Sequence, residues 1–244
     1  WLKVTPASGE VKETVRLEIS ADWSAVPVGN TTAKVTLQPD QGRPLTVTVP
    51  IVNPAELRPG SFSGFVEIDN HVAIEAPHFA RAIDAGGVRW QVLPDFGRTL
   101  GGVTLAPGRF EDLRPGGDSA RLEYDIHFFS AESAKVEFHL APSLDFQPEQ
   151  PLRFAVSFDD EAPQVVLVAT DPNKWEPWGT AVGEGVRRVS TQHKLGRAGR
   201  HTLKVWSVTP GVVFERIVID TGTPRAPGVR PSYMGPPESP TAAK

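Results

Sequence analysis

The sequence predicts an all-β fold. Its 24 prolines and 22 glycines break the chain into short stretches rich in Val and Thr, which favours many short strands joined by turns over a helical bundle. With 244 residues and 39% apolar residues, the chain can build one large domain or two small ones. Two apolar segments, residues 64–81 and 211–222, are expected to lie side by side as the first and last strands of one β-domain.

Residues 1–55 form the first predicted domain. Strands are expected over 1–5, 14–20, 32–37 and 45–52, because turn signals at 6–9, 29–30 and 39–42 separate these apolar runs. In the second run Val15, Leu17 and Ile19 alternate with polar residues, which is the period of a half-buried strand. Four strands are too few for a complete sandwich. We therefore expect a partial immunoglobulin-like sandwich whose opening strands lie upstream and whose exposed edge needs a cover.

Residues 56–63 are predicted to be a linker, and residues 64–222 a second domain. Alternation in 121–129 and 136–140, a hairpin of 152–158 with 164–169, and closing strands at 201–207 and 212–219 predict a two-sheet jelly roll. Helical turns are expected only near 78–83 and after Trp175. Residues 223–244 carry six prolines and predict an extended tail, unless it docks on another surface.

Composition excludes several classes of function. The 25 basic and 29 acidic residues are interspersed and give a net charge of −4, so neither nucleic acid nor an anionic membrane is an expected partner. The absence of cysteine excludes disulfides, thiolate nucleophiles and Cys-ligated zinc. No apolar run approaches the roughly 18 residues of a membrane helix, so a soluble protein is expected. The chain begins without Met inside an apolar pattern, which suggests a piece of a longer polypeptide.

Several segments carry a family resemblance. The segments 65–81, 156–161 (VSFDDE), 217–221 (IVIDT) and 231–239 (PSYMGPPES) occur in this order and resemble the C-terminal region of family 115 glycoside hydrolases. Those enzymes are xylan α-1,2-glucuronidases, which remove glucuronic or 4-O-methylglucuronic acid from glucuronoxylan. The resemblance implies a secreted or periplasmic bacterial parent enzyme. It also implies a galactose-binding-like jelly roll similar to carbohydrate-binding modules of families 6 and 35.

The same resemblance implies partners and a metal. The expected partners are a xylan or glucuronoxylan oligosaccharide, an upstream catalytic domain of the same polypeptide and a possible homodimer. The related modules hold a structural calcium through a Glu-Ala-Glu motif in the first strand and an acid in the last. Here Glu75 keeps the first position, Pro77 replaces the second Glu, and Glu215 or Asp220 offers the last acid. Glu75 and Glu215 are thus candidate calcium ligands; otherwise Glu75 is hydrogen-bonded at a strand end.

Sugar recognition requires an aromatic platform flanked by polar groups. The segment 171–180 (DPNKWEPWGT) offers Trp175 and Trp178 beside Asn173, and Arg98 and Arg187 suit an anionic uronate because a guanidinium matches a carboxylate at two points. The alternative is that Trp175 fills the edge of the core, Trp178 packs on a neighbouring domain and both arginines are solvated surface residues.

Acidic pairs exist, but their surroundings do not favour catalysis. Residues 159–161 occupy a tight turn, where Asp is favoured for local hydrogen bonds. The polar residues within 123–127 and 137–139 would form one patch if their strands were adjacent. Such a patch would be either a metal site or the solvent-exposed face of an antiparallel sheet. No nucleophile elbow, phosphate loop or HExxH motif occurs. We expect a non-catalytic, carbohydrate-binding accessory region; the alternatives are a structural interdomain or dimerisation module and a stand-alone hydrolase.

Overall fold

A computed structural model describes residues 1–11, 15, 17–57, 62–68, 70–108, 111–129, 133–145, 150–169, 175–222, 238, 239 and 241. The described chain is built mainly of antiparallel strands, which confirms the all-β prediction. It divides into two compact units at Phe62 and Ser63. Nowhere in these ranges is there a helix that combines the length and the apolar character needed to cross a bilayer.

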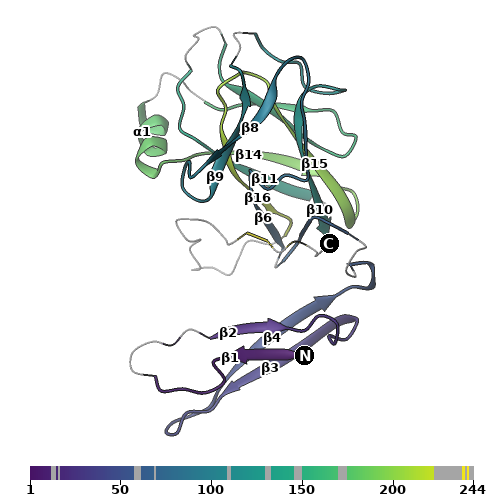
Figure 1. Ribbon diagram of the computed structural model, residues 1–244, viewed down its shortest axis with the longest axis vertical. Helices are drawn as coiled ribbons and strands as arrows, with labels where there is room; N and C mark the ends of the chain where they lie inside the picture. Colours follow the sequence, from purple (N-terminus) through teal and green to yellow (C-terminus); the bar gives the residue numbers. More distant parts are fainter. Residues whose placement is uncertain are drawn as a thin grey trace. The chain divides into compact units, whose positions relative to one another are not determined.

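The first unit contains two antiparallel ribbons (Figure 1). One joins β1 (Leu2–Thr5) to β2 (Glu18–Ala21), and the other joins β3 (Gly29–Leu37) to β4 (Leu45–Asn53), before a 3₁₀ turn at Ala55–Leu57. A strand therefore forms within each expected run, although β2 covers only the end of the run 14–20, of which residues 14 and 16 lie outside the described ranges. β3 begins at Gly29, inside the expected turn at 29–30. Val35 pairs with Val47 and Leu37 with Leu45 on one apolar face of the β3–β4 ribbon, where the Leu45 side chain is 61% exposed.

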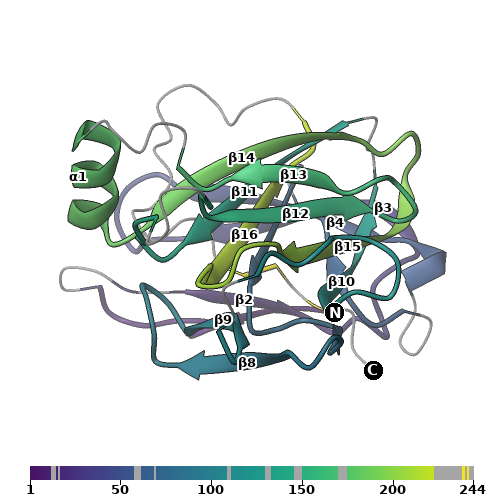
Figure 2. The same cartoon turned by 90° about the horizontal axis from the view of Figure 1, so that it is seen from above.

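The second unit is a jelly-roll sandwich of two sheets (Figures 1 and 2). Sheet I has the order β13 (Gln164–Leu167), β12 (Arg153–Phe158), β15 (Gly199–Ser207), β10 (Arg121–Phe128) and β5 (Phe65–Val66), with β7 (Arg81–Ile83) also on β10. Sheet II has the order β14 (Arg187–Lys194), β11 (Ser133–Leu140), β16 (Phe214–Asp220), β9 (Gly101–Ala106) and β8 (Arg89–Pro94), with β6 (His71–Glu75) also on β16.

Most of the predicted elements of this unit are confirmed. The β12–β13 hairpin forms as expected, and the helix expected after Trp175 is α1 (Trp175–Glu184), which lies at one end of the sandwich beside β14. The helical turn expected near 78–83 is wrong, because residues 81–83 form strand β7 against β10. An arginine in that strand bonds to the acids of β10, and this favours the extended backbone over a helix.

Aromatic rings join the two sheets in the core. Phe138 of β11, Phe154 of β12 and Phe214 of β16 lie with ring centroids 4.7 to 6.2 Å apart in edge-to-face arrangements. All three are buried, and such contacts add to the free energy that burial of each ring supplies. In β10 the predicted alternation of apolar and polar faces is confirmed, because Leu122, Tyr124, Ile126 and Phe128 all belong to the core cluster. The polar residues between them lie on the other face, where Glu123 and His127 are also buried.

The first and last strands lie side by side, as the sequence predicts. β6 and β16 are antiparallel partners from Glu75 with Arg216 to His71 with Asp220. The buried hydroxyl of Tyr124 in sheet I donates a 2.7 Å hydrogen bond to the carbonyl of Ala76 at the end of β6, and burial raises the pKa of this phenol above its ordinary value. The β6–β16 seam is thus fixed both within its own sheet and from the opposite sheet.

Residues after β16 return to this seam. Ser239 donates its backbone N–H to the carbonyl of Ala73 at 2.8 Å and accepts the Ala73 N–H through its hydroxyl at 3.0 Å, while Thr241 pairs with Phe65. The extended tail expected over 223–244 therefore contributes at least these residues to the fold of the second unit. Residues 223–237 lie outside the described ranges.

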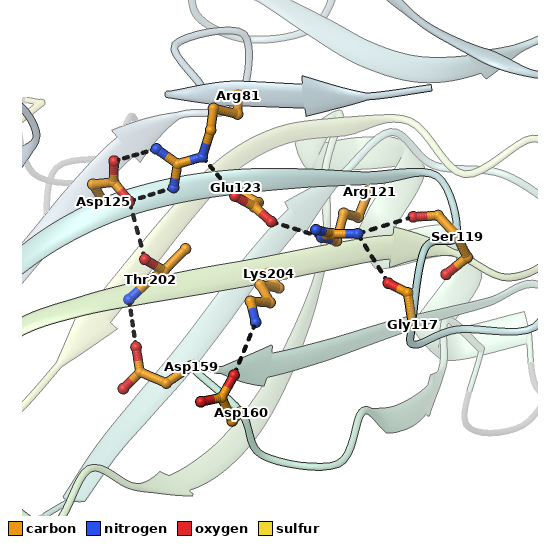
Figure 3. Close-up of polar contacts among 10 residues, drawn as sticks. All are labelled: Arg81, Gly117, Ser119, Arg121, Glu123, Asp125, Asp159, Asp160, Thr202 and Lys204. Carbon is orange, nitrogen blue, oxygen red and sulfur yellow. Dashed lines mark hydrogen bonds and ion pairs between the residues drawn. The ribbon is translucent and has the colours of Figure 1, made fainter. Parts of the chain in front are cut away.

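The outer face of sheet I carries a network of paired charges (Figure 3). Arg81 donates to both oxygens of Asp125 at 2.6 and 2.7 Å and to Glu123 at 2.6 Å, and Arg121 donates to the other oxygen of Glu123. The predicted patch that would combine residues 123–127 with 137–139 is wrong. β10 and β11 follow each other in the chain but belong to opposite sheets, because a jelly roll crosses over between them.

Arg81→Met is expected to lower the free energy of unfolding of the second unit by about 1–2 kcal/mol, since it leaves two partly buried carboxylates without their shared donor. Urea unfolding measures this loss. Arg89→Met on the exposed part of β8 is the control and should cost less than about 0.5 kcal/mol. Equal losses in the two variants would contradict a stabilising role for Arg81.

The same network predicts acid sensitivity. Burial raises the pKa of Glu123 and of Asp125. Hydrogen bonds from Arg81 to both acids, from Arg121 to Glu123 and from Thr202 to Asp125 outweigh this effect, so that both pKa values lie below their ordinary range. As pH falls, these two carboxylates therefore take up protons in the unfolded chain before they do so in the folded one. Their contribution to the free energy of unfolding is present above about pH 4.5 and is lost as pH falls through the folded pKa values. Unfolding midpoints at pH 7, 5, 4 and 3 should fall more steeply in the parent than in Arg81→Met.

Candidate functional site

A β-bulge places a buried acid at one end of the seam. Leu140 of β11 pairs with Phe214 and the preceding His139 pairs with Arg216, so that Glu215 is the extra residue between them. Bulges redirect side chains and are common beside functional sites. Phe214, the residue before Glu215, remains in the core, whereas the side chain of Glu215 turns toward the loop that joins β8 to β9.

That loop packs its backbone against the carboxylate of Glu215. A Cβ atom added to Gly97 would lie 2.5 Å from Cδ of Glu215 and 2.7 and 2.8 Å from its two oxygens, so that only glycine fits here. The backbone N–H of Arg98 donates a hydrogen bond to the same carboxylate. Burial raises the pKa of Glu215 above its ordinary value, and the nearby charge of Glu75 adds to this effect, although Arg98 opposes it.

Glu75 lies beside this acid on the neighbouring strand. Its Oε1 is 3.4 Å from Nη1 of Arg216, its Cα partner across the seam, and its Oε2 accepts a hydrogen bond from the hydroxyl of Thr99. The backbone N–H of Glu75 donates to Oε1 of Glu238 at 2.9 Å, and Nδ1 of His78 lies 2.9 Å from the same oxygen. The structure thus places the carboxylates of Glu75 and Glu215 near enough to each other for their charges to interact.

The chemistry of this pair does not match that of a calcium cage. Calcium takes six to eight oxygen ligands at 2.3–2.6 Å. Glu75 and Glu215 supply two carboxylates here, Thr99 adds a hydroxyl, and Pro77 has no side-chain donor atom in the position where related modules place a second acid. Within the described ranges no three acidic, His or Cys side chains converge as a metal site would require. Calcium at this place stays a prediction, and these residues do not fit it well.

Helix α1 brings together two of the predicted sugar-binding residues. The guanidinium of Arg187, the first residue of β14, lies 5.8 Å from the ring centroid of Trp178 in α1. Nη1 of Arg187 also donates to the carbonyl of Val168 at 3.4 Å. Burial lowers the pKa of Arg187 below its ordinary value, against an opposing effect of Asp145. The ring and the cation therefore hold each other in place, with the Trp178 side chain half-buried.

Arg98 connects this corner to the buried acids. Its Cγ and Cδ lie 3.8 and 3.9 Å from where a Cβ of Gly185 would lie, in the turn between α1 and β14. Apolar side chains are exposed in the β8–β9 loop, which carries Arg98, and in α1. They are Phe96 and Leu100 in the loop and Val182 in α1. The α1 corner, defined here as Arg98, Trp178, Val182 and Arg187, thus combines two cations with apolar and aromatic surface.

The remaining sequence predictions are only partly placed. Asn173 and the side chain of Trp175 lie outside the described residues, so the paired-tryptophan platform stays a prediction. Trp90 packs against the core and lies 6.2 Å from Phe214, whereas Trp206 is buried with Ala155 and Val208 in a separate small cluster. Thr99 and Arg216 were not expected at the site. Pairing Glu75 with its opposite residue in the last strand would have identified Arg216, but the register is a tertiary property.

Fold and site define an accessory-type β-sandwich with an aromatic and cationic corner. The family model of the glycosyl hydrolase family 115 C-terminal domain matches residues 64–238. The chain therefore belongs to this family, which confirms the resemblance of the sequence. No curated protein matches it significantly.

Several solved structures are similar. They include a family GH115 4-O-methyl-α-glucuronidase with specificity for decorated arabinogalactans (15% identity, TM-score 0.49, covering 64% of this chain and 18% of that one). Two carbohydrate-binding modules also match. One is the C-terminal family 6 module of a laminarinase from Zobellia galactanivorans (19% identity, TM-score 0.41, covering 62% of this chain and 99% of that one). The other is a family 35 module from Clostridium thermocellum (14% identity, TM-score 0.39, covering 61% of this chain and 97% of that one). All three TM-scores lie below 0.5, so the assignment rests on the family match.

Gly97→Ala is expected to destabilise the second unit more than Gly86→Ala. Both glycines have positive φ, +79° and +62°, but a Cβ at Gly86 meets nothing within 4 Å. The control variant Gly86→Ala should therefore lose only about 1–2 kcal/mol of the free energy of unfolding, because alanine is strained at positive φ. Gly97→Ala should lose a further ~1–3 kcal/mol, because its Cβ displaces Glu215. Urea unfolding of both variants measures the difference. Equal losses would contradict the close approach of the loop to Glu215.

Proposed function

We propose that this chain is a non-catalytic accessory region of a xylan α-1,2-(4-O-methyl)glucuronidase that acts in glucuronoxylan degradation. Membership in the family 115 C-terminal domain family supports this proposal. The matched enzyme structure is several times longer than this chain, which aligns with 18% of it. The partner proposed for the chain is therefore the catalytic domain of its own polypeptide, and the proposed location of the parent enzyme is outside the cell or in the periplasm.

We further propose that the α1 corner binds the uronate-bearing part of the polysaccharide. The observation that carries this proposal is the guanidinium of Arg187 over the ring of Trp178. A pyranose ring favours the face of an aromatic side chain, and a uronate carboxylate favours a guanidinium fork. Because α1 and β14 already hold both groups, little side-chain entropy is lost when a ligand binds. The second cation, Arg98, extends the same surface.

The binding proposal predicts that the full chain binds glucuronoxylan oligosaccharides and that Trp178→Ala weakens this binding at least 10-fold, about 1.4 kcal/mol. Calorimetric titration measures both. Trp23→Ala is the matched control, since Trp23 is an exposed tryptophan of the first unit, and it should leave the affinity unchanged. Titration with unsubstituted xylo-oligosaccharides tests whether binding requires the uronate carboxylate. Titration with decorated arabinogalactan tests whether the chain prefers a xylan main chain. An absence of heat at millimolar ligand would contradict the proposal.

The alternative function is a structural interdomain or dimerisation module without a sugar ligand. The apolar face of the β3–β4 ribbon favours this alternative, because Leu45 and Val47 are exposed on it. If the chain has this structural function, titration with glucuronoxylan oligosaccharides gives no binding heat. Sedimentation then shows self-association of the chain or its binding to the separate catalytic domain. Turnover of an aryl uronide by this chain alone would contradict both non-catalytic functions and favour a stand-alone hydrolase.

A further inference from the structure

The calcium site implied by the related modules coincides with an internal cation. Arg216 lies on β16 directly opposite Glu75 on β6, and both side chains are only 5% exposed. A buried carboxylate requires a counter-charge, because desolvation of an unpaired ion is very costly. We propose that the guanidinium of Arg216 takes the place of calcium at the β6–β16 seam and that the fold of this domain does not depend on the metal.

The oxygens of Glu75 already have partners. Oε1 faces Nη1 of Arg216 at 3.4 Å, and Oε2 accepts the hydroxyl hydrogen of Thr99. A calcium ion bound by Glu75 would have to share the carboxylate with these two groups. It would also lie within a few ångströms of a positive charge in a poorly solvated environment, where like charges repel strongly. The cation that the seam requires is thus part of the chain.

The oxygens of Glu215 are covered by backbone. A Cβ on Gly97 would lie within 2.8 Å of both oxygens, and the N–H of Arg98 donates to the carboxylate. The β8–β9 loop therefore lies against this carboxylate and supplies a backbone donor to it, which leaves less room for the several oxygen ligands that calcium takes. The bulge at Glu215 turns the side chain toward this loop and so gives the carboxylate a backbone donor in place of a metal.

Pro77 is consistent with this exchange. In the related modules the corresponding residue is a second acid of the first strand, two positions after the residue that Glu75 matches. Loss of that acid removes a negative charge from the seam, and Arg216 then suffices for the neutralisation of Glu75. The two features belong together, because a calcium cage with one acid fewer and one guanidinium more would have both too few ligands and an opposing charge.

Metal removal from the full chain is the direct test. We expect the unfolding temperature measured in excess EDTA to agree within about 1 °C with that in excess CaCl₂, and calorimetric titration with CaCl₂ to give no binding heat. Both results would support a metal-free seam. A lower unfolding temperature in EDTA that calcium restores, or a saturable calcium heat, would overturn the proposal.

Variants test the role of Arg216 separately. Arg216→Met keeps much of the apolar part of the side chain but leaves Glu75 without its counter-charge, so the unfolding temperature should fall well below that of the control Arg89→Met. The double variant Arg216→Met/Glu75→Gln should recover part of this loss, because it also removes the unpaired charge. If Arg216→Met does not fold, recovery of folding in the double variant supports the same conclusion. An Arg216→Met variant as stable as the control would overturn it.

Discussion

The pairing of β6 with β16 is the constraint on which the rest of the second unit depends. These strands come from opposite ends of the domain, and their register alone places Glu75 opposite Arg216. Tyr124 fixes the end of β6 from the other sheet, and Ser239 covers its free edge. The bulge at Glu215 is possible because the strand is held on both sides of it. The position of the β8–β9 loop, and with it that of Arg98, follows from the same pairing.

Two groups of acids in this domain, on the outer face of sheet I and at the β6–β16 seam, are paired with arginines. On the outer face of sheet I, Arg81 binds two acids of β10, and on sheet II Arg216 pairs with Glu75. Such networks stabilise a sheet face only when every group has a partner, since a single deletion leaves an unpaired ion. Such pairing of arginines with acids indicates a structural role. It also directs the search for ligand binding to the α1 corner, where cations lie beside exposed apolar side chains.

This separation of roles suits an accessory domain. The sandwich supplies rigidity through the aromatic contacts of Phe138, Phe154 and Phe214 and through the seam. The α1 corner is built on the connection between sheets I and II, where changes of sequence cost little core packing. If the proposed binding surface is confirmed, its position away from the core would allow it to change without loss of the fold.

The all-β class could be predicted from the sequence alone, and so could the strands β10 and β11, the β12–β13 hairpin, helix α1 and the adjacency of the first and last strands. Period-2 alternation and turn residues act locally, so they are readable without a structure. The sheet to which each strand belongs was not readable, and this is why the patch predicted across β10 and β11 was wrong. Three contacts appear only in the folded chain: Arg216 faces Glu75, Gly97 lies against Glu215, and Arg187 lies over Trp178. Each of these contacts joins residues that are distant in the chain or depend on a bulge, and register and burial set them rather than any local propensity.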